Sequence, residues 1–326
     1  MAESFQKDCR QPVREADAAT RDDQKMKCTS NLFTAGRYAF LTGRRTYLMG
    51  ILNTTPDSFS DGGLYFSRDQ ALRRAEEMIR QGVDIIDIGG ESTRPGSQDV
   101  PAQLEIERTA PVISAIAGNF DIPVSIDSYK FEVAQAALKA GACIVNDIYG
   151  LLHDARLADL AAQYKAGLIV MHNARYYRSG HSSYAGSQIS ADASFKRELE
   201  DKNLIESVII CLDKSLKTAG EAGVDPACLL LDPGVGFGTD TRESIALIKH
   251  LPELKQLNRP ILLGPSRKRF IGELTGMQAD QRLLGTAAAV TAGIASGADF
   301  IRIHDVAAIK EVVQVADALL RHMEEA

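Results

Sequence analysis

Eight short apolar runs, rich in leucine and β-branched residues, alternate with helical patterns along most of the chain. The runs cover residues 47–52, 83–88, 123–127, 143–147, 168–172, 229–232, 261–264 and 300–304. Runs of this kind are typical of parallel strands that are buried on both faces. Eight strand–helix units in about 250 residues predict a closed (β/α)8 TIM barrel. An open, doubly wound sheet is the alternative, but the sequence lacks the GxGxxG turn that is typical of it.

Two features precede the barrel. Residues 1–30 are charged and have no hydrophobic periodicity, so we expect a mobile tail there. Leu32-Phe33 and Tyr38 to Leu41 flank Gly36-Arg37, a pattern that predicts a small hairpin. The remaining chain, residues 31–326, is then expected to be a single catalytic domain.

Helical patterns separate the strands. Ser67 is expected to cap a helix over residues 68–81, whose inner face would carry Ala71, Ala75, Met78 and Ile79. Further helices are expected at residues 132–140, 154–164 and 281–296. The long insertion at residues 173–192 is expected to be a surface loop on the side of the barrel mouth.

Composition excludes several classes of partner. The net charge of −6 and the pI of about 5.6 argue against nucleic acid or an anionic membrane surface. No apolar run approaches the roughly 18 residues of a membrane span, and residues 1–27 contain no signal-peptide core. The five cysteines are scattered without CxxC spacing, as expected in a reducing cytoplasm.

Polar side chains follow every predicted strand. They are Asn53, Glu91 to Arg94, Asp127, Asn146 with Asp147, His172, Asp232, Ser266 to Lys268, and Arg302 to Asp305. In a barrel of this type all these strand ends surround one mouth. A single Asp at a strand end is more often a helix cap than a catalyst. Capping needs only one short residue per helix, however, so the repeated pattern predicts a functional site.

Asp127 and Asn146 come directly after apolar runs, so their side chains need hydrogen-bond partners in a partly buried place. A flat heterocycle with several N–H donors and one carbonyl would satisfy both residues. Four cations, Arg94, Arg267, Lys268 and Arg302, would converge on the same mouth, with His304 nearby. They predict an anionic group such as phosphate or carboxylate, and salt bridges to the mouth's own carboxylates are the alternative.

A metal ion would fit beside such an anion. Asn53 and the aspartates of the first loop offer oxygen ligands to a Mg2+ that bridges a diphosphate. The six histidines are dispersed, and none forms a cluster with cysteine at zinc spacing.

Eight motifs in fixed order relate the sequence to a known family. They are MGILNTTPDSFSDGG (49–63), IDIGGESTRPG (86–96), SIDSYK (125–130), VNDI (145–148), VMH (170–172), LDPGVGFG (231–238), GPSRK (264–268) and RIHDV (302–306). Over residues 46–322 the chain resembles the dihydropteroate synthases. The resemblance implies condensation of 6-hydroxymethyl-7,8-dihydropterin diphosphate with para-aminobenzoate, giving dihydropteroate and pyrophosphate in the presence of Mg2+.

The resemblance also implies roles for individual residues. The pterin site falls on Asp127, Asn146, Asp232 and Lys268, with Met171 and Phe237 as walls. The diphosphate site falls on Asn53, Arg94, Arg302 and His304, and Asn53 also serves the metal. The aminobenzoate site falls on Phe59, Thr93, Pro95 and Ser266. The implied catalytic set is Asn53, Asp61, Asp127, Lys268, Arg302 and His304, with Asp61 shielding a cationic intermediate.

The family further implies a homodimer built from the last helices and competitive inhibition by sulfonamides. The second loop has no insertion after Glu91, which resembles the drug-sensitive form. The sequence departs from the family pattern at Thr239, Pro265, Arg269 and the loop at residues 173–181. A pterin-binding methyltransferase barrel and an inactive paralogue are the alternatives. The cations and histidine of the GPSRK and RIHDV motifs argue against the methyltransferase, which does not bind a diphosphate. The intact catalytic positions argue against the inactive paralogue.

Overall fold

The computed structural model describes residues 31–54, 64–92, 97, 99–178 and 190–321, and of residues 64–67 it describes the backbone alone. Eight of its strands form one sheet. They are β3 (Tyr47–Asn53), β4 (Ile85–Gly89), β5 (Val124–Asp127), β6 (Ile144–Asp147), β7 (Gly167–Met171), β8 (Leu229–Asp232), β9 (Leu262–Leu263) and β10 (Phe300–Ile303). Each lies within two residues of a predicted run.

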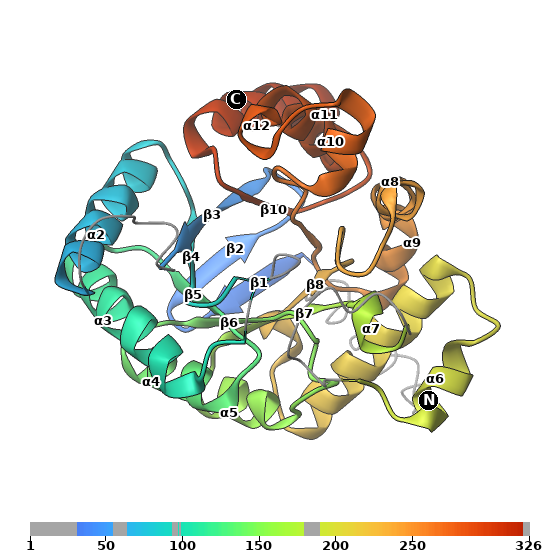
Figure 1. Cartoon of the computed structure of the whole chain (residues 1–326), viewed down its shortest axis with the longest axis horizontal. Coiled ribbons are helices and arrows are strands. Elements are labelled where there is room, and N and C mark those ends of the chain that lie inside the picture. Colours follow the sequence, from blue (N-terminus) through green and yellow to red (C-terminus); the bar gives the residue numbers. More distant parts are fainter. Residues whose placement is uncertain (1–30, 55–63, 93–96, 98, 179–189, 322–326) are drawn as a thin grey trace, which may run out of the picture.

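These strands are parallel and pair in the order β8-β7-β6-β5-β4-β3-β10-β9. A parallel bridge between Leu231 and Ile261 joins the two outer strands of that order and closes the sheet. Figure 1 shows the strands at the centre with the helices around them. The predicted (β/α)8 barrel is therefore confirmed.

The described helices surround the barrel in chain order. They are α2 (Leu64–Arg80), α3 (Ala102–Asn119), α4 (Phe131–Lys139), α5 (Arg156–Tyr164), α6 (Ala193–Leu199), α7 (Leu204–Glu221), α8 (Thr241–Lys249), α9 (Leu251–Leu254), α10 (Arg269–Thr275), α11 (Leu283–Ala295) and α12 (Val306–Leu320), with short 3-10 turns at Ala174–Tyr176, Pro226–Cys228, Lys255–Leu257 and Ala279–Gln281. Among them, none combines the length and the apolar composition that crossing a bilayer requires.

One predicted helix start is wrong. α2 begins at Leu64, about one turn before the predicted cap, so Ser67 lies inside the helix. Its inner face is as predicted, because Ala71, Ala75 and Met78 are fully buried. The predicted loop over residues 173–192 is described only at its two ends, and residues 179–189 lie outside the described chain.

The predicted hairpin, β1 (Leu32–Ala35) and β2 (Tyr38–Leu41), is antiparallel and closes the N-terminal end of the barrel. Phe33 packs edge-on against Phe300 with ring centroids 5.5 Å apart, and Phe40 packs against Tyr47 at 5.1 Å. Gly167 leaves room for Phe33, since a Cβ there would lie 2.6 Å from the ring's Cζ. The hairpin shares one buried cluster with Met49, Ile85, Ile144, Ile169, Leu230 and Leu262, which fills the lower half of the barrel.

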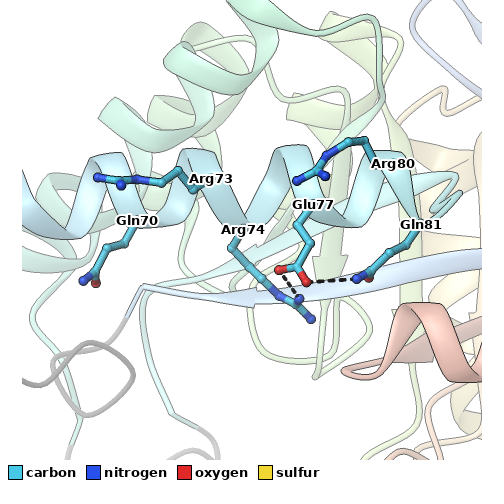
Figure 2. Close-up of a pocket in the computed structure, with 6 residues that line it drawn as sticks. All are labelled: Gln70, Arg73, Arg74, Glu77, Arg80 and Gln81. Carbon is cyan, nitrogen blue, oxygen red and sulfur yellow. Dashed lines mark hydrogen bonds and ion pairs between the residues drawn. The ribbon is translucent and has the colours of Figure 1, made fainter.

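A groove of about 730 Å3 follows the outer side of α2 (Figure 2). Its lining residues are Gln70, Arg73, Arg74, Glu77, Arg80 and Gln81. Arg74 donates to Glu77 at 2.6 Å and to the carbonyl oxygen of His304 at 3.1 Å. The helix is thereby tied to the C-terminal end of β10, at the rim of the mouth.

Candidate active site

A polar layer lies directly above the apolar cluster inside the barrel. Successive inward-facing positions of a strand are two residues apart, so Asp87 of β4 follows Ile85 toward the mouth. The guanidinium of Arg302 donates from Nε to Asp87 Oδ2 at 2.6 Å and from Nη2 to Asp127 Oδ2 at 2.5 Å. Asn146 Nδ2 donates to the same Asp87 oxygen at 3.4 Å. Four strands thus bring four polar side chains together.

The charges of this layer are only partly balanced. One guanidinium serves the buried carboxylate of Asp87 and the partly buried carboxylate of Asp127, an arrangement that the forked geometry of arginine favours. Burial alone would lower the pKa of Arg302, but Asp87 and Asp127 raise it above its usual range. Burial raises the pKa of Asp127, and Arg302 opposes that shift. A ligand edge that donates hydrogen bonds would stabilise the excess negative charge.

Sequence reasoning assigns no role to Asp87, although it is fully buried at the centre of the site. The sequence signal that could have identified Asp87 is a carboxylate at an inward-facing position within an apolar strand, because a buried carboxylate needs a hydrogen-bond or charge partner. Its second oxygen, Oδ1, and the hydroxyl of Ser125 on the neighbouring strand have no hydrogen-bond partner among the described residues.

Lys268 and Phe237 form one wall of the site. The ammonium of Lys268 lies 4.2 Å from the centroid of the Phe237 ring, and Arg175 approaches the same ring at 5.4 Å. Gly236 has φ +81°, and a Cβ there would lie 3.1 Å from Lys268 Cδ, so glycine lets the lysine lie across the loop. Burial lowers the pKa of Lys268 to about 8. Sequence reasoning did not single out Arg175.

Asp232 ends β8 and accepts a hydrogen bond from the backbone N–H of Gly234 at 2.7 Å. Burial raises its pKa to about 6. Its loop is held by His172, whose Nδ1 lies 3.1 Å from the carbonyl oxygen of Pro233 and whose Nε2 lies 2.9 Å from the hydroxyl of Tyr177. Because a carbonyl only accepts, Nδ1 carries the proton and Nε2 accepts from Tyr177. Burial lowers the pKa of His172 to about 4, so it is neutral and positions the loop.

Helix capping does not explain these aspartates. The N-cap of α4 is Lys130, three residues after Asp127, and the N-cap of α8 is Asp240, eight residues after Asp232. The capping alternative therefore fails for both side chains.

Ser266 and His304 meet at the rim. Ser266 Oγ lies 2.9 Å from His304 Nδ1 and accepts the backbone N–H of His304 at 3.2 Å. Sequence reasoning placed Ser266 with the aminobenzoate and His304 with the diphosphate, so the structure brings the two predicted subsites into contact. Asn53 borders the layer from β3, because the Cβ position of Gly89 lies 3.7 Å from both Asn53 Oδ1 and Asp127 Cβ.

The remaining predicted residues divide into a group that the structure describes and a group that it does not. Met171 is buried with Tyr149 and Phe237 above the polar layer. Arg267 pairs with Asp305 at 2.5 Å, so the salt-bridge alternative applies to it, as it does in part to Arg302. The other group lies outside the described residues and comprises Phe59, Asp61, Thr93, Arg94 and Pro95.

The metal prediction rests on Asn53 alone in the part of the chain that the structure describes. In that part no three His, Cys, Asp or Glu side chains come together as a metal site. An amide oxygen with substrate phosphate oxygens and waters is a donor set that suits Mg2+. Asn53 offers one such oxygen from the end of β3.

Comparison with known proteins identifies the family of the chain. The family described as pterin binding enzyme matches residues 49–304. A dihydropteroate synthase of Synechocystis sp. is 43% identical over 288 residues, which cover 88% of this chain and 94% of that protein.

Two solved structures share the fold. The dihydropteroate synthase of Clostridium difficile, solved in the presence of pteroic acid, has a TM-score of 0.77 and 42% identity, covering 86% of this chain and 99% of that one. The Xanthomonas albilineans enzyme with 4-aminobenzoic acid has a TM-score of 0.77 and 36% identity, covering 89% and 98%. The chain therefore belongs to the family of pterin binding enzymes.

Proposed function

We propose that this protein is a dihydropteroate synthase, which condenses 6-hydroxymethyl-7,8-dihydropterin diphosphate with para-aminobenzoate and releases pyrophosphate. The observation that carries the proposal is the polar layer inside the barrel. Asp127, Asn146 and Asp232 offer two carboxylates and an amide to one flat ligand, beside the wall made by Lys268 and Phe237. Relatives that are 42–43% identical over most of the chain carry the same name.

The described residues support a reaction in which the diphosphate leaves first. The carboxylates would bind the donor edge of the pterin, and the pterin ring would delocalise the positive charge on its methylene. Arg302 and His304 would hold the diphosphate near Asn53. A Mg2+ bound there would offset the charge of the departing diphosphate. The aminobenzoate nitrogen, a weak nucleophile, would then attack a carbon that is already electrophilic.

We further propose a cytoplasmic homodimer. The described cysteines, Cys143, Cys211 and Cys228, are all free thiols, as expected in a reducing compartment. Large apolar side chains are exposed on α10, the turn after it, α11 and α12, which Figure 1 shows together at one edge of the barrel. They are Leu274, Met277, Leu284, Val315, Leu319 and Leu320. A patch of this kind favours a second copy of the chain as its partner.

The experiment that tests the function is product formation by the purified full-length chain. Dihydropteroate should appear only when the pterin diphosphate, para-aminobenzoate and Mg2+ are all present, with one pyrophosphate released per product. The assay contains no cobalamin, so a corrinoid-dependent methyltransferase would be silent in it. Pterin binding without product would instead identify an inactive paralogue.

A further inference from the structure

Arg175 lies in the short 3-10 turn Ala174–Tyr176 after β7, in the loop where the sequence departs from the family pattern. Its guanidinium carbon is 5.4 Å from the centroid of the Phe237 ring, and the ammonium of Lys268 is 4.2 Å from the same centroid. Two cations from different loops thus approach one aromatic ring. The negative potential of a ring face attracts cations at these distances.

The loop that carries Phe237 is shaped to admit both cations. Gly236 and Gly238 flank the phenylalanine and have φ values of +81° and +73°. A Cβ on Gly236 would lie 3.1 Å from Lys268 Cδ, and a Cβ on Gly238 would lie 2.6 Å from the backbone nitrogen of Arg175 and 2.9 Å from its Cγ. Any side chain at position 238 would therefore displace Arg175 from the ring.

Backbone contacts fix the turn without help from the guanidinium. Asn173 Oδ1 accepts the backbone N–H of Arg175 at 3.1 Å, and Asn173 Nδ2 donates to the carbonyl oxygen of Ile148 at 3.1 Å. The N–H of Ala174 donates to the carbonyl oxygen of Phe237 at 3.1 Å. These bonds set where the two side chains begin, so contacts of the side chains themselves decide how the ring is oriented.

Apolar packing restrains only part of that ring. Phe237 is partly buried at the edge of a cluster that contains Tyr149 and Met171. Burial lowers the pKa of Arg175, and it lowers the pKa of Lys268 to about 8, so both cations have lost part of their hydration. A partly dehydrated cation gains more from an aromatic ring than a fully solvated one.

We propose that Arg175 is a positioning residue, which together with Lys268 fixes the ring of Phe237 as a wall of the pterin site. The inference rests on the proposed function, in which Phe237 borders the pterin. Arg175 acts on the ligand through the ring, and its guanidinium is not a ligand of the diphosphate. A wall that is ordered before the ligand arrives avoids the cost of ordering it on binding, which raises the affinity for pterin.

The first test separates the ring from the anion by calorimetry with 6-hydroxymethylpterin and with pyrophosphate. Arg175→Met keeps an unbranched apolar stem and removes the charge. It should raise the Kd for the pterin about five- to thirtyfold and change the Kd for pyrophosphate less than twofold. Arg175→Lys, which still brings a cation to the ring, should raise the pterin Kd less than threefold. A greater loss for pyrophosphate than for the pterin would make Arg175 an anion ligand and overturn the proposal.

Arg178→Met is the matched control. It removes a cation from the same segment, where Arg178 donates to Glu243 Oε1 at 2.7 Å. Both dissociation constants should stay within twofold of those of the unmodified protein. A loss of pterin affinity equal to that of Arg175→Met would mean that any change in the segment has this effect, which would overturn the proposal.

A double-mutant cycle tests whether Arg175 acts through Phe237. In the Phe237→Leu background Arg175→Met should change the pterin Kd less than twofold, because the ring is absent. The same fold-change in both backgrounds would overturn the proposal, and so would an unchanged pterin affinity in Phe237→Leu alone. An unmodified protein that binds the pterin but forms no dihydropteroate would refute only the proposed function. If Arg175→Met does not fold, Arg175→Gln takes its place in the cycle with the same expected result.

Discussion

The buried carboxylate of Asp232 destabilises the fold when it is ionised, as the direction of its pKa shift shows. Its pKa rises from 3.8 to about 6 because the side chain is buried. Below pH 4 the carboxyl is protonated in both the folded and the unfolded chain, and above pH 6 the folded chain bears the full cost of a buried charge. This cost is offset when a ligand donates hydrogen bonds to the carboxylate.

Asp232→Asn should therefore stabilise the protein at pH 7 by on the order of 1–3 kcal/mol while weakening pterin binding at least tenfold. The amide oxygen can still accept from Gly234. Urea unfolding measured between pH 4 and pH 8 should show the gain shrinking as the pH falls through 6 toward 4. A gain that is independent of pH would show that the buried charge is not its source.

Asp147→Asn is the matched control. The pKa of Asp147 is likewise raised to about 6 by burial. Both its oxygens, however, accept backbone N–H groups, from Tyr149 at 2.9 Å and Leu151 at 2.7 Å. An amide can accept only one of them well, so this variant should lose stability and keep its pterin affinity.

His304 and Arg302 should respond differently to removal. His304→Ala should weaken binding of pyrophosphate at least tenfold and binding of a pterin without diphosphate less than twofold. Arg302→Ala should weaken both, because Asp87 and Asp127 lose their shared cation. Calorimetry with the two ligands separates these outcomes, and equal losses in His304→Ala would mean that its bond to Ser266 is structural.

Sulfonamide inhibition probes the residues around Ser266. We expect inhibition that is competitive with para-aminobenzoate, measured as a KM that rises linearly with drug concentration while kcat is constant. Pro265 is buried next to Ser266, and its carbonyl oxygen accepts the N–H of Lys268 at 3.3 Å. If the enzyme stays fully active at drug levels far above the KM for para-aminobenzoate, Pro265→Ala is the first variant to measure.

At the level of elements, the hairpin β1–β2 depends on a close contact with β7. Gly167→Ala would place a methyl group 2.6 Å from Phe33 Cζ and 3.1 Å from Ala35 Cβ, so it should cost about 1–3 kcal/mol by overpacking. Phe33→Leu removes the ring atom that would clash. Gly167→Ala should therefore lower the free energy of unfolding less in the Phe33→Leu background than in the unmodified protein. Guanidinium unfolding of the unmodified protein, the two single variants and the double variant measures the difference. If the effects of the two substitutions on the free energy of unfolding simply add, the contact between residue 167 and Phe33 is not the cause.

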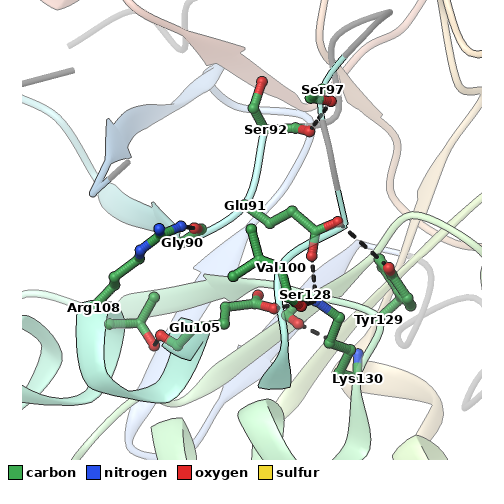
Figure 3. Close-up of polar contacts among 11 residues, drawn as sticks. Gly90, Glu91, Ser92, Ser97, Val100, Glu105, Arg108, Ser128, Tyr129 and Lys130 are labelled. Atoms are coloured by element: carbon green, nitrogen blue, oxygen red, sulfur yellow. Dashed lines mark hydrogen bonds and ion pairs between the residues drawn. The ribbon is translucent and has the colours of Figure 1, made fainter. Parts of the chain in front are cut away.

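The strands could be predicted because each is a continuous apolar run, and that pattern is local. The start of α2 was missed because Ser67 resembles a cap, although the backbone before it is already helical. Asp127, Asn146 and Asp232 could be predicted as strand-end groups. The hydrogen bonds that Lys130 Nζ donates to Glu91 and Glu105 (Figure 3) could not, because these residues are 39 and 25 positions away and belong to other parts of the chain.

At the scale of the whole molecule, the exposed leucines of α11 and α12 predict the assembly. Leu284 is 84% exposed and Leu319 is 77% exposed, which is a liability for a monomer. Light scattering should give twice the chain mass of 35.3 kDa. Leu319→Glu should halve that value, whereas Leu41→Glu on the hairpin, also at an exposed leucine, should not. A monomeric unmodified protein would contradict the proposed homodimer.

The hairpin that fills the lower half of the barrel has a kinetic consequence. Phe33 and Phe40 pack into that end, so we expect ligands to reach the polar layer from the opposite end of the barrel. The proposed function puts the pterin diphosphate at Asp127 and Asp232 and para-aminobenzoate nearer the mouth at Ser266. On that assignment we expect the pterin diphosphate to bind first and to be retained while the second substrate is bound.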